Sequence, residues 1–207
     1  MQTIAQQNES LVAEFIQGTK KSTQARKQLE QVENELARLS KDFISVQEKL
    51  TKVGFNDAIG VRLRKLRVNF PDLVRHRRAL TARNDELNSI QFRRVELEEA
   101  LLATVDIGTE IDRRFSEYND LDAEKSSDLR AEVQQALLEQ KAQYLLPLAE
   151  FYDIYFDDVL EPLHENERLL ITTGEDFSNF ISEFILWVQS THPLNVTDLA
   201  QTWRALY

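Results

Sequence analysis

A heptad pattern of apolar and small residues runs through the first quarter of the chain. From Leu11 to Val53 these residues recur in alternating steps of four and three, which is the spacing of a coiled-coil seam. The positions are Leu11, Phe15, Gly18, Ser22, Ala25, Leu29, Val32, Leu36, Leu39, Phe43, Val46, Leu50 and Val53. A helix of about 63 Å cannot bury such a seam on itself, so the pattern predicts a partner helix. Gly54 is placed to end the helix.

A second heptad pattern follows in residues 73–101. Before it, Asn56 or Asp57 can cap a short helix at about 56–68, and Pro71 lies at or near the first position of the next long helix. The second seam consists of Leu73, His76, Leu80, Arg83, Leu87, Ile90, Arg94, Leu97 and Leu101. Two arginines and a histidine make it more polar than the first. The simplest arrangement is an antiparallel coiled-coil hairpin within residues 1–102.

The second half of the chain, residues 103–207, is also predicted to be helical. Residues 103–127 indicate a connection, after which Ser126 or Ser127 can cap a helix. Pro147 and Pro162 lie within the apolar pattern that follows and predict kinks.

The segment Thr173–Asp176 has the form of a capping box that would begin a new helix through Val188. One continuous helix across Gly174 is the alternative. The predicted fold is therefore all-α, an elongated antiparallel coiled-coil hairpin followed by long kinked C-terminal helices. A single continuous domain is also compatible with the pattern.

Composition supports this fold. The 207 residues include only five Gly and four Pro, with 42% hydrophobic and 29% charged residues, as in globular or coiled-coil helical proteins. No apolar run approaches the ~20 residues that span a bilayer, and no signal-peptide pattern opens the chain. We expect a soluble domain, which can be an excised piece of a longer protein.

Catalytic and metal-binding patterns are incomplete. The chain has no Cys. Glu161 and His164 form one Glu-x-x-His pair, but a helical di-iron site needs two, and neither other histidine has a Glu three residues before it. Residues 120–124 resemble the start of a calcium loop, yet Lys125 replaces its glycine. We therefore predict a protein that is not an enzyme, without catalytic residues, metal ligands or cofactor.

Charge is distributed unevenly along the chain. Residues 62–94 hold ten Lys or Arg and three acidic residues, whereas residues 106–176 hold nineteen acidic and six basic residues. The whole chain carries a net charge of −10. Because leucines interleave with the basic residues, we interpret the run as the solvated, ion-paired face of a helix. Contact with anionic components of the cell envelope is the second interpretation, and nucleic acid is not an expected partner.

Three stretches resemble a known family. "AIGVRLRKLRVNFPDLVRHRRAL" at 58–80, "VELEEALLA" at 95–103 and "FILWVQSTHPLNVTDL" at 184–199 are similar to segments of the periplasmic (MscS porin) domain of large MscS-type mechanosensitive channels, the MscK (KefA) group of Gram-negative bacteria. The resemblance covers roughly residues 10–200. It implies an inner-membrane channel that protects against osmotic stress by releasing solutes such as potassium.

The resemblance also implies a location and partners. The chain would be a periplasmic domain joined to transmembrane and pore regions outside it, in a channel of seven copies. Phe184, Trp187 and Pro193 would form a membrane-proximal segment, with the aromatics near the membrane interface and the proline redirecting the chain. We expect the isolated domain to be a monomer or weak dimer, with the small residues Gly18, Ser22 and Ala25 as the place of closest approach.

Two alternatives stay open. Phe184 and Trp187 can instead pack into an ordinary helical core. The chain can also be a free-standing coiled-coil scaffold or adaptor with no channel attached. In either case the first seam can pair within one chain or between chains.

Overall fold

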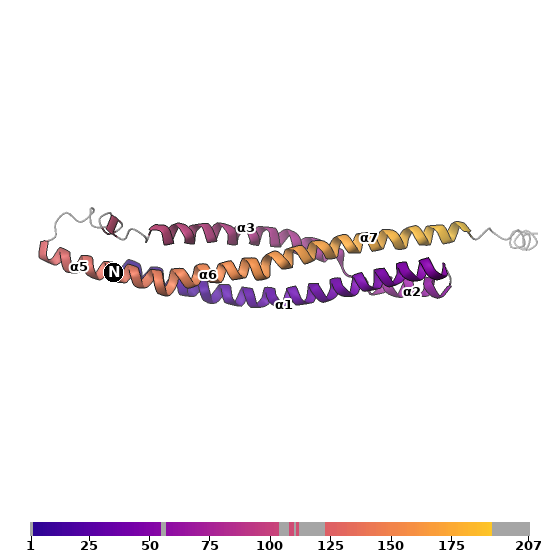
Figure 1. The fold of residues 1–207 in the computed structure, drawn as a ribbon, viewed down its shortest axis with the longest axis horizontal. Coiled ribbons are helices and arrows are strands. Elements are labelled where there is room, and N and C mark those ends of the chain that lie inside the picture. Colours follow the sequence, from indigo (N-terminus) through magenta and orange to yellow (C-terminus); the bar gives the residue numbers. More distant parts are fainter. Residues whose placement is uncertain (1, 55–56, 104–107, 110, 112–122, 192–207) are drawn as a thin grey trace, which may run out of the picture. The chain divides into compact units, whose positions relative to one another are not determined.

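The structure is a computed structural model that describes residues 2–54, 57–103, 108–109, 111 and 123–191. Its helices are α1 (Gln2–Val53), α2 (Asp57–Val68), α3 (Leu73–Ala103), α5 (Ala123–Gln140), α6 (Leu146–Tyr155) and α7 (Glu161–Thr191) (Figure 1). Two π-helical turns, η1 (Lys141–Leu145) and η2 (Phe156–Leu160), join the last three. The described residues contain no strand, so the all-α prediction is confirmed.

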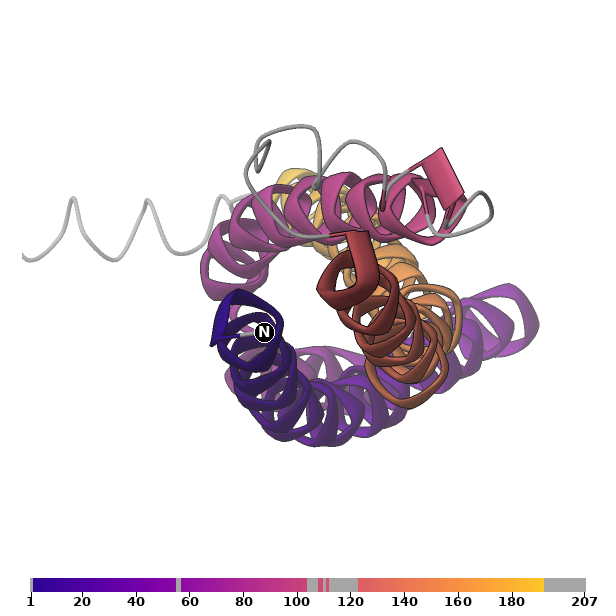
Figure 2. The ribbon, with the colours of Figure 1, turned by 90° about the vertical axis from the view of Figure 1, so that its left-hand side faces the viewer.

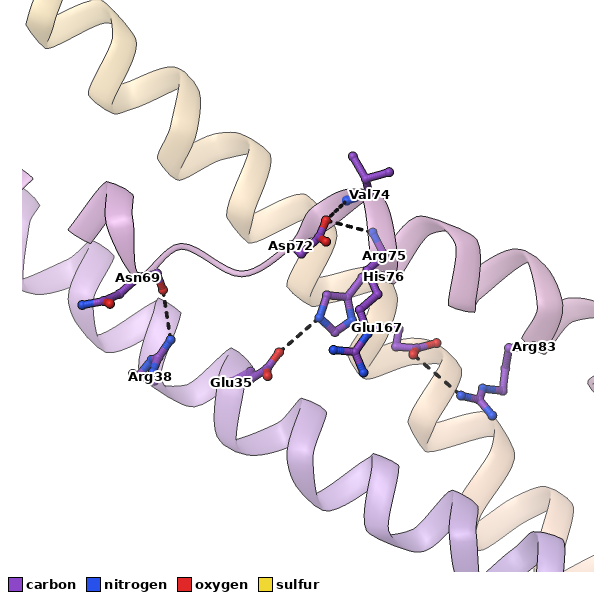
Figure 3. Close-up of polar contacts among 9 residues, drawn as sticks. All are labelled: Glu35, Arg38, Asn69, Asp72, Val74, Arg75, His76, Arg83 and Glu167. Carbon is purple, nitrogen blue, oxygen red and sulfur yellow. Dashed lines mark hydrogen bonds and ion pairs between the residues drawn. The ribbon is translucent and has the colours of Figure 1, made fainter. Parts of the chain in front are cut away.

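Local capping explains where the first helices end and begin. Gly54 adopts φ +70°, and its N–H donates to the Leu50 carbonyl at 3.0 Å, which closes α1 as predicted. The cap of α3 is Asp72, whose Oδ1 accepts from the N–H groups of Val74 and Arg75 at 3.1 and 3.0 Å (Figure 3). Pro71 thus precedes the cap rather than opening the helix.

Pro147 and Pro162 are accommodated by the two π turns. In each turn the N–H just before the proline donates five residues back, from Leu146 to Lys141 and from Glu161 to Phe156. A proline has no N–H and its ring clashes with the carbonyl four residues earlier, so the backbone widens there instead of breaking. The two π turns thus lie beside the prolines at which the sequence predicts kinks.

The next helix begins earlier than predicted. α5 starts at Ala123, before Ser126 and Ser127, so neither serine is its cap. Helix propensity is higher for the Ala, Glu and Lys at positions 123–125 than for Ser, which favours extension of α5 toward its N-terminus.

The chain divides into two compact units, each of which combines residues from before and after position 102. The first consists of the chain up to Glu33 together with Arg78–Glu167, and the second of Asn34–Arg77 together with the chain from Arg168 onward. We describe each by itself.

The first unit is a three-helix arrangement of α1, α3 and the α5–α6 segment with the start of α7 (Figure 2). Contacts of Glu14 with Arg93 and of Gln28 with Arg83 show that α1 and α3 pair antiparallel. The buried apolar residues are Ile4, Ala25, Val32, Ile90, Leu97, Ile111, Val133, Leu137, Leu145, Leu148, Tyr152, Tyr155, Val159, Leu160 and Leu163.

The second unit packs the end of α1 against α2, the first turn of α3, and α7. α2 also runs antiparallel to α1, because Arg62 contacts Ser45 and Asp42 while Asn69 contacts Arg38. The buried apolar residues are Leu39, Val46, Leu50, Ile59, Leu63, Leu170, Ile171, Phe177 and Ile181.

The capping-box prediction at Thr173–Asp176 is wrong, and the alternative of one continuous helix is right. α7 passes through Gly174 without interruption. A Cβ at this position would lie 2.6 Å from Cδ2 of Leu73, so the glycine serves close packing of α7 on α3 rather than a helix start.

The two heptad seams lie largely inside the units. All nine positions of the second seam are buried or half-buried, including Arg83, whereas Phe15 and Val53 of the first seam are 40% and 68% exposed. No helix within the described residues is long and apolar enough to cross a membrane.

Candidate functional site

The most distinctive chemistry of the first unit is a layer of polar side chains centred on Glu14. Arg93 of α3 donates to both carboxylate oxygens of Glu14, each at 2.8 Å, and to Glu96 at the same distance. Tyr152 of α6 donates its hydroxyl to Glu14 at 2.8 Å. Side chains from three helices therefore meet at one carboxylate of α1.

The protonation of this layer follows from its contacts. Burial acts to raise the pKa of Glu14, but the hydrogen bonds from Arg93 and Tyr152 and the charge of Arg93 outweigh it, so the pKa lies below its usual value. Burial and the neighbouring Glu14 carboxylate raise the pKa of Tyr152. Glu14 is thus charged and Tyr152 a neutral donor at pH 7.

A second polar layer surrounds Arg83, whose side chain is 10% exposed. Its guanidinium donates to Gln28 of α1 at 3.1 Å and to Glu86 at 3.4 Å, and lies 3.7 Å from Glu167 of α7 (Figure 3). Tyr155 donates to Glu86 at 2.9 Å, and burial together with this carboxylate raises the pKa of the tyrosine. This layer also draws on all three helical segments of the unit.

Arg94 forms a more exposed contact between α3 and the region of η2. It donates to Asp153 at 2.6 Å and to Asp157 at 3.4 Å, and its guanidinium lies 4.8 Å from the centre of the Phe156 ring. The π turn brings Asp157 within reach of the arginine that also holds Asp153.

An aromatic group fills the space beside the small residues of α1. The ring of Phe151 packs on Phe15 at 5.2 Å and on Tyr155 at 5.9 Å between centroids. A Cβ on Gly18 would lie 2.7 Å from this ring. Gly18, Ser22 and Ala25 are buried, and at Gly18 the chain's own Phe151 takes the place predicted for a second chain.

In the second unit, phenylalanines take the place of the polar layers. Phe177 of α7 stacks on Phe43 at 4.8 Å and packs on Phe70 at 5.9 Å, and Phe180 meets Phe43 edge-on at 5.5 Å.

Polar contacts of the second unit surround this aromatic group. His76 lies 3.1 Å from Glu35, and Arg38 donates to the Asn69 carbonyl at 3.1 Å (Figure 3). Arg77 donates to Glu175 at 2.5 Å. They join α1 to α3, α1 to the turn that follows α2, and α3 to α7.

These arrangements join helices to one another. Two hollows lie within the described residues, one of about 490 Å³ beside Val12 and Tyr144 and one of about 500 Å³ beside Leu50 and Phe180. Neither contains a histidine or a paired acid and base. No cluster of three potential metal ligands occurs in the described part of the chain, where Glu161 is exposed and His164 half-buried.

The predicted seam and membrane-proximal residues lie in different environments. Of the seam, Val32, Leu39, Val46 and Leu50 are buried, and Leu29, Leu36 and Phe43 are half-buried. Phe184 and Trp187 belong to α7, but their side chains lie outside the described residues, as does Pro193 entirely.

Sequence reasoning missed the partners of the polar layers, although Arg83 and Arg94 were placed in the second seam. Glu14 directly precedes the seam residue Phe15, and Tyr152 lies three residues before Tyr155. An arginine at a seam position signals that a carboxylate must face it, but the sequence does not say which one.

Comparison of the chain with models of protein families, with curated proteins and with solved structures finds no match.

Proposed function

We propose that this chain is a non-catalytic helical domain in the periplasmic part of a large MscS-type mechanosensitive channel, where it has a mechanical or regulatory role. The assignment to a channel draws on the resemblance of residues 58–80, 95–103 and 184–199. In the proposed protein, pore and transmembrane regions lie elsewhere in the parent chain, and seven copies assemble around the pore.

The observation that carries the mechanical role is the pair of polar layers around Glu14 and Arg83. In each, one charged side chain receives partners from two other helical segments, at distances of 2.8–3.7 Å. Directional contacts between charges that are buried, as around Arg83, or partly buried, as at Glu14, fix the register between helices, because a shift of one residue leaves a charge without its partner. Helices held in register in this way suit a domain that transmits or resists displacement.

A domain of this kind influences gating only if its contacts differ between the closed and open channel. The proposal therefore predicts an effect on the tension that opens the channel and none on ion flow through the open pore. The pore residues are not part of this chain, so conductance is the internal control.

The alternative is a free-standing helical scaffold with no channel attached. One observation argues against an adaptor that binds its partner through the α1 seam. Most of that seam is buried against the chain's own helices. A scaffold would have to bind through outward faces.

The parent gene and its product test the proposal. We expect the reading frame to encode apolar segments of about 20 residues downstream of Tyr207. Patch recordings from cells expressing the full-length protein should show tension-activated currents, and Arg83→Met should change the opening threshold at unchanged conductance. A reading frame without such segments, or a protein without tension-activated current, would leave the scaffold as the better explanation.

A further inference from the structure

The basic run of residues 62–94 is only half neutralised by ion pairs. Arg62, Arg77, Arg83, Arg93 and Arg94 each contact a carboxylate. The remaining cations, Arg64, Lys65, Arg67, Arg75 and Arg78, have no carboxylate partner among the described residues, and all five are exposed. Three of them belong to α2, so the unpaired charge is concentrated on this short helix.

α2 has two distinct faces. Its inward face holds Ile59 and Leu63, which are 7% and 2% exposed, and attaches the helix to the second unit. The outward face carries Val61 and Val68, which are 47% and 84% exposed and seven residues apart. Arg64 and Lys65 lie between these valines on the same stripe, since residues three, four and seven apart share one side of a helix.

The outward face is largely exposed to solvent. The side chain of Arg64 reaches only the Gly60 carbonyl of its own helix, at 3.4 Å. Val68 leaves most of its apolar surface in contact with water. Cations without partners and valines without cover, alternating on one stripe, form an amphipathic surface that the rest of the described chain does not use.

We propose that this outward face of α2, made of Val61, Arg64, Lys65 and Val68 with the exposed Arg67 at its edge, docks onto an anionic phospholipid bilayer. Arg64, Lys65 and Arg67 meet lipid phosphates, while the two valines enter the boundary between headgroups and acyl chains. The proposal uses only residues of α2, so it stands or fails independently of the channel assignment.

The composition of the face favours lipid over other anionic partners. A nucleic acid offers phosphates but no apolar layer for the valines, and α2 has no aromatic side chain to stack on bases. A second copy of this acidic chain could supply carboxylates. Binding to nucleic acid or to a second copy is therefore an outcome that the test must separate from lipid binding.

The test is flotation of the full chain with vesicles. We expect it to bind vesicles of phosphatidylglycerol and phosphatidylethanolamine in 50 mM salt, to bind less in 300 mM salt, and not to bind phosphatidylcholine. Each cation near an anionic surface contributes about fivefold to affinity. The variant Arg64→Gln/Lys65→Gln/Arg67→Gln should therefore bind about a hundredfold more weakly, and Val61→Ser/Val68→Ser should lose the binding that persists in high salt.

The matched control is Lys20→Gln/Lys21→Gln/Lys27→Gln, which removes three exposed charges from α1 and should bind like the wild type. Circular dichroism establishes that every variant is folded. The proposal would be overturned if the chain bound neutral and anionic vesicles equally. It would also be overturned if the control and the α2 variant lost the same amount of binding. Salt-sensitive self-association, or binding to DNA, without binding to anionic vesicles would likewise overturn it.

Discussion

In the first unit the helices meet through carboxylates, guanidinium groups and tyrosines, whereas in the second they meet chiefly through phenylalanines and a close-packed glycine. The first unit holds thirteen basic and twenty-six acidic residues, the second twelve and nine. Two regions built on the same heptad spacing are thus stabilised differently. Heptad spacing determines that helices pair, while the side chains at a few seam positions determine how strongly the pair depends on charge.

This contrast has a physical basis. A buried ion pair fixes register but gains little net stability, because desolvating the charges offsets their attraction. Buried aromatic rings contribute through area and packing and do not depend on protonation. The first unit should therefore respond more strongly than the second to changes of charge and pH.

The largest expected effect is in the aromatic group of the second unit. Phe177 is 1% exposed and contacts Phe43 and Phe70, so Phe177→Ala should lower the free energy of unfolding by about 4 kcal/mol. Hydrogen exchange by mass spectrometry should show faster exchange mainly in residues 34–77 and 168–183. The control Phe92→Ala removes a ring that is 66% exposed and should change stability by less than about 0.5 kcal/mol.

A somewhat smaller effect is expected from the Arg83 layer of the first unit. Arg83→Met leaves Glu167, whose side chain is 4% exposed, without its guanidinium and should cost about 3 kcal/mol, measured by urea unfolding. The double variant Arg83→Met/Glu167→Gln should recover at least half of this loss, because no buried charge remains at Glu167. Arg78→Met, one exposed cation on the same helix, is the control. Equal stability of the Arg83 and Arg78 variants would mean that this layer does not hold the helices.

Two glycines in the long helices, Gly18 of α1 and Gly174 of α7, provide a third comparison. Gly18→Ala would bring a methyl group within 2.7 Å of the Phe151 ring, which is held by Phe15 and Tyr155. Overpacking should exceed the gain in helix propensity of about 1 kcal/mol and give a net loss of about 1–2 kcal/mol.

Gly174→Ala meets only the methyl ends of Leu73, which can rotate away, so its net effect in thermal unfolding should be near zero. A larger loss of stability for Gly174→Ala than for Gly18→Ala would mean that the contact with Leu73 is more rigid than the contact with Phe151.

Much of the fold was accessible from the sequence because it depends on periodicity. The seams at 11–53 and 73–101, the helix at 56–68 and the stop at Gly54 rest on spacing and on one residue with a special conformation. The prediction at Gly174 was wrong because a glycine followed by Glu and Asp occurs both in capping boxes and where two helices pack closely. Only the position of Leu73 distinguishes them.

The candidate site was less accessible, because its partners are far apart in the chain. Arg93 and Glu14 are 79 residues apart, and Tyr152 and Glu14 are 138 apart. At the first π turn the buried positions of the structure step by five, from Gln140 to Leu145, two residues before Pro147, whereas at the second both Val159 and Leu160 are buried. A five-residue step beside a proline is compatible with a π turn, whereas an α-helical seam advances by three or four.

An effect smaller than those of the Phe177, Arg83 and Gly18 variants is expected from acid. The pKa of Glu14 is lowered in the folded state, so its contribution is present above the unfolded value of 4.5 and is lost as pH falls through the folded pKa. Since Glu14 is partly exposed, we expect Glu14→Gln to cost no more than about 1 kcal/mol at pH 7, and the difference from the wild type to shrink between pH 5 and pH 3. Urea midpoints at several pH values measure this difference. Glu33→Gln, which removes an exposed carboxylate from the same helix, is the control. If the difference in stability between Glu14→Gln and the wild type stayed constant down to pH 3, the layer would depend on side-chain packing and on the hydrogen bond from the tyrosine hydroxyl rather than on the charge of Glu14.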